Sequence, residues 1–192
     1  NPVFLLKQAM TVDEISGGRV TFGVGAGWTR REHEAYSWEL YDPKTRIDRF
    51  EEALEIWDLL QTRERITYFG KHYELIDAPF EPKSSQGKLP VLIGGTKPRM
   101  LRLVARYADI WNSVGDLDVA GTASKHLDKA CAEVGRDRIE HFHNAIAQFG
   151  LERRDRHAAA VVEVLVLLVV RFRLGLGTLF RFGRGDDRAG GR

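Results

Sequence analysis

Apolar side chains between Ile47 and Leu60 recur at spacings of three and four residues, the repeat of one face of an α-helix. Asp42-Pro43 precedes this stretch and is typical of a helix start. A similar but weaker spacing runs from Pro2 to Ile15 and stops at Ser16-Gly17-Gly18. The pattern therefore predicts two helices, each with one buried face. The residues on the clearer face are Ile47, Phe50, Leu54, Trp57 and Leu60.

Short apolar runs alternate with these helices and predict strands. The predicted strands cover residues 19–24, 90–93, 108–112 and a part of 139–149, and helices are predicted over 98–107 and 117–134. The wholly apolar run Val91–Ile93 is typical of a parallel strand that is buried on both faces. Tyr68–Tyr73 predicts a small hairpin with its turn at Gly70-Lys71. The alternation of strand and helix predicts an α/β fold with a parallel sheet.

Composition narrows the classes of partner. The 192 residues include 29 Lys and Arg and 27 Asp and Glu. The resulting net charge of +2 gives no reason to expect nucleic acid or a membrane surface as a binding partner. The single cysteine, Cys131, forms no intramolecular disulfide and suits a cytoplasmic protein. The start of the chain lacks the features of a signal peptide, and the apolar stretch 158–170 is too short to span a bilayer. We expect a small-molecule substrate, and a homodimer remains open.

The first candidate site is the glycine loop after the strand that ends at Val24. Its residues are Gly25, Ala26, Gly27 and Trp28. With Gly23 the glycines follow the pattern G-x-G-x-G, whereas a dinucleotide fingerprint requires G-x-G-x-x-G. The loop fits better a barrel strand whose carboxyl end passes beneath a flat ring. A tight strand-to-helix turn without a ligand is the alternative.

The second candidate site follows the buried strand 90–93 and consists of Gly94, Gly95, Thr96 and Lys97. Free backbone N–H groups at a helix start, together with the helix dipole, favour an anion. Thr96 is expected to cap the helix and to donate to a phosphate oxygen, and Lys97 and Arg99 to supply positive charge. We therefore interpret the segment as a grip for a cofactor phosphate. Ordinary capping with a solvated Lys97 is the alternative.

Other familiar catalytic motifs are absent from the sequence. It contains no G-x-S-x-G elbow, no P-loop, no HExxH and no cysteine cluster. His141 and His143 would share one face of a strand, which leaves a metal site open, although surface histidines explain the pair as well. No catalytic residue can be named from the sequence.

Several motifs occur in an order that resembles the luciferase-like monooxygenase superfamily. They are Ser16–Arg19, Phe22–Trp28 with Glu32, Arg46–Leu54 with its R-x-x-R-F-E-E-A-L pattern, Tyr68–Tyr73, Pro90–Gly95 and Ala105–Asn112. The Gly-Trp and Ile-Gly-Gly forms are most similar to the branch that uses the deazaflavin coenzyme F420. The resemblance covers about residues 1–148.

The resemblance implies a (β/α)8 TIM barrel with a reduced flavin or deazaflavin at the carboxyl ends of its strands. Gly94–Lys97 would surround the cofactor phosphate, and Gly25–Trp28 would lie beside the ring or the substrate. Arg46 would orient the loop that closes over the site. The implied activity is hydride transfer between F420 and a small organic substrate. The alternative within the family is an FMN-dependent monooxygenase that uses O2 and reduced flavin.

Two departures from this resemblance concern the ends of the chain. The sequence begins in a helix that would follow the third barrel strand, and residues 153–192 form an atypical low-complexity segment rich in Arg and Gly. We therefore expect a partial barrel over residues 1–152 and an atypical tail over 153–192. An inactive truncated remnant of such an enzyme is the third functional alternative.

Overall fold

The computed structural model describes residues 1–114, 117–136, 140–144 and 167–170. The helices are α1 (Pro2–Ser16), α2 (Arg30–Ala35), α3 (Pro43–Thr62), α4 (Pro98–Tyr107) and α5 (Leu117–Glu133). The strands are β1 (Val20–Val24), β2 (Arg65–Phe69), β3 (Glu74–Pro79), β4 (Val91–Gly94), β5 (Ile110–Val114), β6 (Glu140–Asn144) and β7 (Leu167–Val170). Each helix and strand predicted from the apolar pattern is present within a few residues of its expected bounds.

Five strands form one sheet in the order β6-β5-β4-β1-β7. β1, β4, β5 and β6 run parallel, which confirms the predicted parallel sheet. β7 is the exception, because it pairs antiparallel with β1 at the outer edge of the sheet. The tail predicted for residues 153–192 lies otherwise outside the described residues, so the domain division after residue 152 stays a prediction.

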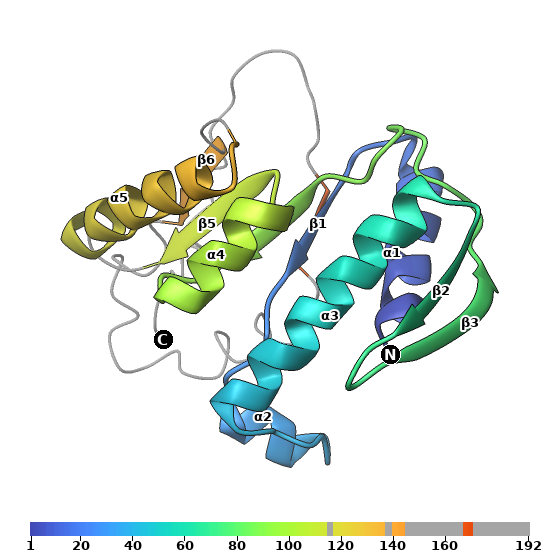
Figure 1. Cartoon of the computed structure of the whole chain (residues 1–192), viewed down its shortest axis with the longest axis horizontal. Coiled ribbons are helices and arrows are strands. Elements are labelled where there is room, and N and C mark those ends of the chain that lie inside the picture. The colour runs from blue at the N-terminus through green and yellow to red at the C-terminus, as the bar shows by residue number, and fades with distance from the viewer. Residues whose placement is uncertain (115–116, 137–139, 145–166, 171–192) are drawn as a thin grey trace, which may run out of the picture.

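Helices α3 and α4 lie side by side in front of the sheet, and α5 follows next to α4 (Figure 1). α1 packs on β1 and on α3. The ring of Phe22 on β1 meets the ring of Trp57 on α3 edge-on at 5.0 Å. Both rings are buried, so the core lies between the sheet and its helical layer. In the part of the chain that the structure describes, no helix is long and apolar enough to cross a membrane.

Side-chain caps fix the starts of α1 and α3. The carboxylate of Asp42 accepts from the backbone N–H groups of Lys44 and Thr45 at 2.9 and 3.1 Å, and Pro43 occupies the first turn. Asn1 caps the backbone N–H groups of α1 in the same way. Such caps satisfy N–H groups that have no partner within the helix.

The predicted hairpin is the ribbon β2–β3, which packs along α3 (Figure 1). Its turn lies where the sequence places it, and Gly70 N–H donates to the carbonyl of Tyr73 at 2.9 Å. The carboxylate of Glu52 on α3 accepts from the N–H groups of Lys71, His72 and Tyr73. A Cβ at Gly70 would clash with the carboxylate of Glu52, so glycine lets the carboxylate approach the turn this closely.

A buried carboxylate ties α1 to the amino end of the sheet. Asp13 is fully buried and accepts from Ser84 Oγ at 2.6 Å, from Gln86 Nε2 at 2.8 Å and from Val20 N–H at 3.3 Å. Gln86 also donates to the carbonyl of Val20 at 2.8 Å. The network joins α1, the first residue of β1 and the loop before β4, and it lies at the opposite end of the strands from both glycine loops.

Candidate functional site

The sheet brings the two glycine loops together. Val24 is in register with Ile93 on the neighbouring parallel strand, so the chain leaves β1 and β4 at the same carboxyl edge. All eight residues predicted to bind the cofactor, 25–28 and 94–97, therefore lie at this one edge. The carboxyl edge of a parallel sheet is where α/β folds bind their ligands.

The second loop has a backbone that needs glycine. Gly95 has φ +124°, and a Cβ on it would lie 2.8 Å from Cγ of Met100. Its carbonyl accepts from the indole Nε1 of Trp111 at 2.8 Å, and its N–H donates to the carbonyl of Asn112 at 3.3 Å. Trp111 is fully buried in β5, so the loop is held from the neighbouring strand. Sequence reasoning missed this role of Trp111, because the contact depends on the register between β4 and β5.

The start of α4 differs from the expectation in its capping residue. The N-cap is Lys97, with φ −79° and ψ 147°, and no side chain caps the helix. The prediction that Thr96 caps α4 is therefore wrong, because Pro98 takes the first helical position and moves the cap one residue along. The first N–H groups of α4 remain without a side-chain acceptor, and this end of the helix keeps its partial positive charge.

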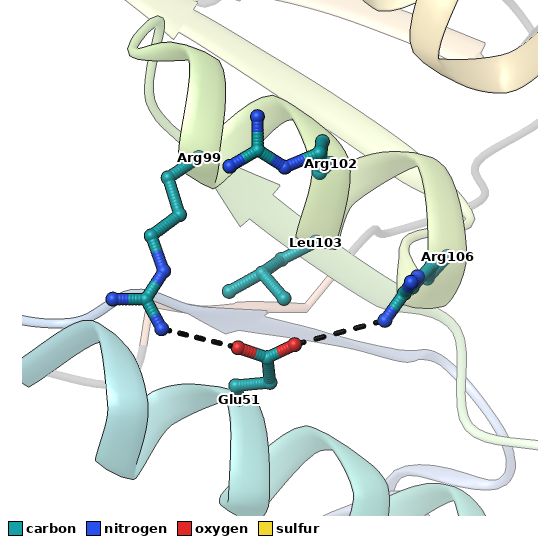
Figure 2. A pocket seen from close by; sticks show the side chains of 5 residues that line it. All are labelled: Glu51, Arg99, Arg102, Leu103 and Arg106. Atoms are coloured by element: carbon teal, nitrogen blue, oxygen red, sulfur yellow. Dashed lines mark hydrogen bonds and ion pairs between the residues drawn. The ribbon is translucent and has the colours of Figure 1, made fainter. Parts of the chain in front are cut away.

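Arg99 does not contribute free charge to this helix start. Its guanidinium contacts the carboxylate of Asp48 on α3. It also contacts Glu51, which Arg106 contacts from the other side at 3.7 Å (Figure 2). The ammonium of Lys44 and the guanidinium of Arg99 hold the pKa of Asp48 at about 2. Arg99 thus fastens α4 to α3, and Lys97 is left as the cation beside the glycine loop. The contacts surround a small cavity of about 130 Å³ on the outer face of the two helices.

A larger hollow lies between the starts of α4 and α5. It has a volume of about 430 Å³. Thr96, Lys97 and Pro98 line it at the start of α4, and Asp118, Thr122 and His126 line it from α5. The uncapped start of α4 therefore opens beside a space whose wall contains two hydroxyls, an ammonium, an imidazole and the carboxylate of Asp118.

Arg46 and His33 fix the first loop. Nη1 of Arg46 on α3 donates a hydrogen bond to the carbonyl of Gly27. Gly27 has φ +72°. The ring of His33 lies against the same glycine, since a Cβ there would be 3.4 Å from Cε1 of His33. Trp28, next in the chain, is 67% exposed. Arg46 thus contacts the first glycine loop, while its expected role in orienting a loop that closes over the site stays a prediction.

Buried polar atoms without a hydrogen-bond partner gather at this end of the fold. Among the described residues they belong to Glu32, Arg46, Asn112 and His72. Glu32 lies in α2, Arg46 near the start of α3, and Asn112 in the middle of β5 opposite Gly94, whereas His72 lies in the hairpin turn. Because buried polar atoms are nearly always paired in folded proteins, water, a ligand or another part of the protein completes the hydrogen bonding of these atoms. An asparagine inside the apolar strand 108–112 was the sequence signal for one of them.

Metal chemistry has no support in the described part of the chain. No group of three or more His, Cys, Asp or Glu side chains is placed to hold a metal ion there. The side chains of His141 and His143 lie outside the described residues, so that pair stays a hypothesis.

Comparison with known proteins places this arrangement in a family. The family model for luciferase-like monooxygenases matches residues 1–179. The chain belongs to the luciferase-like monooxygenase family. Its fold is correspondingly an incomplete TIM barrel of the bacterial-luciferase type.

Relatives in sequence include proteins from mycobacteria. The chain is 34% identical over 142 residues to an uncharacterized protein of Mycobacterium tuberculosis. The aligned region covers 72% of this chain and 49% of that protein. It is 30% identical over 156 residues to the phthiodiolone/phenolphthiodiolone dimycocerosates ketoreductase of Mycobacterium kansasii, covering 76% and 40%. The chain thus spans about half the length, or less, of the curated relatives that it matches.

The solved structure of an F420-dependent secondary alcohol dehydrogenase in complex with an F420-acetone adduct has a similar fold. The TM-score is 0.66 at 23% sequence identity, over 74% of this chain and 44% of that one. At this identity the likeness establishes the fold alone.

Proposed function

We propose that the chain is part of an F420-dependent oxidoreductase that transfers a hydride between the deazaflavin and a small organic substrate. The observation that carries the proposal is the pairing of two glycine loops at the carboxyl ends of neighbouring parallel strands. One loop runs into a helix start that no side chain caps.

The residues present fit a phosphate group. Gly95 has no side chain where a Cβ would meet Met100, and the first N–H groups of α4 point out of the helix end without a side-chain acceptor. Thr96 and Lys97 line the hollow beside them. Gly94 to Lys97 would therefore hold the phosphate with backbone N–H groups, one hydroxyl and one ammonium.

The first loop fits the flat part of a cofactor or substrate. A Cβ added at Gly25 would find no atom within 4 Å, so the backbone there is open to close approach. The contact of Arg46 with the Gly27 carbonyl keeps this loop in one conformation. A fixed, open backbone next to Trp28 would orient a planar ring at the edge of the sheet.

The division of labour between protein and cofactor follows from these contacts. Bound F420 would supply the hydride-transferring ring, whose chemistry belongs to the cofactor. The protein would bind the phosphate through the second loop and position the ring along the first. The buried atoms of Glu32 and Asn112 that lack partners would gain polar contacts when the site is filled.

Two relatives support a reducing activity. The name of the M. kansasii protein describes a ketoreductase, which acts on a carbonyl group. A second relative, 27% identical over 175 residues, is the 5,10-methylenetetrahydromethanopterin reductase of Archaeoglobus fulgidus. Both are reductases by name, which favours hydride transfer over oxygenation for this chain.

Titration with each cofactor tests the proposal. The 192-residue chain is titrated separately with F420 and with FMN, and binding is followed by the fluorescence of the cofactor. We expect F420 to bind and FMN to bind at least tenfold more weakly. Tight FMN binding without F420 binding would replace the proposal with the flavin-dependent monooxygenase. Absence of binding by either cofactor would favour the inactive remnant.

A further inference from the structure

Helix α3 contacts separate pieces of the chain along one side of its first half. Arg46, Arg49 and Glu52 follow one another at intervals of three residues, so their side chains lie on the same side of the helix. Arg46 donates to the carbonyl of Gly27 in the first glycine loop. The carboxylate of Glu52 accepts from backbone N–H groups of the hairpin turn, residues 70–73. Arg49 lies between these two contacts, and the proposed function leaves it without a role.

The guanidinium of Arg49 joins two tyrosine rings. Its Cζ lies 4.6 Å from the ring centroid of Tyr41 and 5.0 Å from the ring centroid of Tyr73. At such distances a cation is attracted by the electron-rich face of an aromatic ring. Among the described residues the side chain of Arg49 forms no hydrogen bond and no ion pair, so the two rings are what hold it.

The two rings come from segments that are distant in the sequence. Tyr73 ends the hairpin turn, where its N–H donates to Glu52 at 3.1 Å and its carbonyl accepts from Gly70 N–H at 2.9 Å. Its ring is half-buried and packs against the hydrophobic core, so it is a fixed point. Tyr41 belongs to residues 28–42, which connect the first glycine loop to α3 and which we call the connecting segment.

The connecting segment is tied to Gly27 by its own contacts. The ring of His33 lies against Gly27, and its Nδ1 is 2.9 Å from the carbonyl of Thr29. Trp38 N–H donates to the carbonyl of His33 at 2.8 Å. These contacts run from Gly27 to Trp38, three residues before Tyr41, and give a path by which a shift of Tyr41 reaches the loop.

We propose that Arg49 is a positioning residue that, through Tyr41, keeps the connecting segment and the first glycine loop in the conformation that binds the ligand. The inference rests on the proposed function for what the loop binds. It adds that the hairpin supports the site, since the ring of Tyr73 holds Arg49 in place. A loop that is already fixed loses less conformational entropy on binding, which favours affinity.

Hydrogen exchange of backbone amides in the 192-residue chain without ligand tests the positioning directly. Arg49→Ala should speed exchange of Trp38 N–H, which is bonded to His33, about tenfold, because the segment opens more often. Exchange of Phe22 N–H, which donates to the carbonyl of Pro90 in the sheet at 2.7 Å, should stay unchanged. Unchanged exchange at Trp38, or equal acceleration at both amides, would overturn the proposal, since the second result reports a general loss of stability.

A double-mutant cycle in F420 affinity shows whether Arg49 acts through Tyr41. Arg49→Ala and Tyr41→Leu should each raise the Kd for F420 about fivefold, and the double variant should be no worse than either, because both remove the same contact. Arg49→Lys keeps a cation for the rings and should recover part of the affinity. Losses that multiply in the double variant would contradict an action through Tyr41.

Lys7→Ala is the matched control for the cycle. The ammonium of Lys7 lies 5.0 Å from the ring centroid of Phe80 and donates to the carbonyl of Glu81 at 3.1 Å, so it too joins a cation to an aromatic ring. It contacts neither the connecting segment nor a glycine loop, and F420 affinity should stay unchanged. An equal loss of affinity in Lys7→Ala would show that the effect of Arg49 is unspecific.

The two experiments separate the causes of failure. If the wild type does not bind F420, the proposed function fails, and amide exchange still decides whether Arg49 positions the loop. If the wild type binds F420 and Arg49→Ala binds it equally well, the positioning role is refuted and the proposed function stands.

Discussion

The indole Nε1 of Trp111 donates a hydrogen bond of 2.8 Å to the carbonyl oxygen of Gly95, so a side chain in β5 holds the loop that follows β4. Gly95 has φ +124°, and its peptide groups can rotate more freely than those of other residues. The fully buried indole removes that freedom. A rigid second loop is thereby built by two neighbouring strands.

Trp111→Phe should weaken F420 binding as well as stability. The substitution keeps most of the buried ring but removes the donor to Gly95, at a cost of about 1–2 kcal/mol in the free energy of unfolding. The loosened loop should raise the Kd for F420 several-fold. Urea unfolding and fluorescence titration measure the two effects.

Trp57→Phe is the matched control for that experiment. Trp57 is also buried and donates its Nε1 hydrogen to a carbonyl, that of Pro2, at 2.7 Å. It joins α3 to α1, away from the glycine loops. A similar loss of stability with unchanged F420 binding is expected. If both variants weaken F420 binding equally, the loop of Gly95 has no special role.

Gly95→Ala should disrupt the proposed phosphate-binding loop. An added Cβ would lie 2.8 Å from Cγ of Met100, and φ +124° strains any L-residue with a side chain. We expect at least a tenfold loss of F420 affinity and a lowered midpoint of urea unfolding. The control is Gly121→Ala, since a Cβ on Gly121 in α5 meets no atom within 4 Å. That variant should be stabilised by about 0.5–1 kcal/mol with unchanged affinity.

Asp13→Asn should reduce stability without changing F420 affinity. The buried carboxylate accepts from Ser84, Gln86 and Val20, and an amide cannot accept from all three donors. A loss of about 3 kcal/mol in the free energy of unfolding is expected, because the substitution leaves buried donors without an acceptor. Ser84→Ala, which removes one donor, should cost less. Measurable loss of F420 affinity in Asp13→Asn at temperatures where it is folded would contradict the separation of this network from the site.

Stability should fall in acid partly through Asp48. Lys44 and Arg99 lower the pKa of Asp48 to about 2 in the folded chain, below its value of 3.8 in the absence of partners. The contribution of its charged form is therefore complete above about pH 4 and is lost as the pH falls toward 2. Between pH 5 and pH 2.5 the wild type should lose more stability than Asp48→Asn, as measured by urea unfolding. Glu64→Gln, at an exposed carboxylate without an ion pair among the described residues, should follow the wild-type pH profile.

The elements that the sequence predicted correctly depend on local patterns. The spacing of Phe50, Leu54 and Trp57 specifies α3 by itself, and the apolar run that ends at Gly94 specifies β4. Parallel pairing of β1 and β4 then brings the two glycine loops to one edge. That juxtaposition could be inferred because it follows from the order of strands and helices alone.

The details that the sequence did not predict depend on contacts between distant residues. Arg99 turns to α3 because Asp48 and Glu51 lie there, about 50 positions earlier in the chain. The N-cap of α4 is Lys97 and not the predicted Thr96, because Pro98 suits the first helical position. The partner of Gly95 is Trp111, which only the register of β5 reveals. None of these contacts leaves a periodic signal in the sequence.

The Asp13 network and the glycine loops lie at opposite ends of the same strands, and this separation has a consequence for how such a protein can evolve. The buried Asp13 network stabilises the amino end, whereas the loops that we propose to bind the cofactor lie at the carboxyl end. Replacement of Trp28, Tyr36 or Trp38 alters exposed side chains and leaves the buried anchor untouched. Exposed side chains at the carboxyl edge can therefore change at little cost in stability, and a library restricted to these positions should yield folded variants at high frequency.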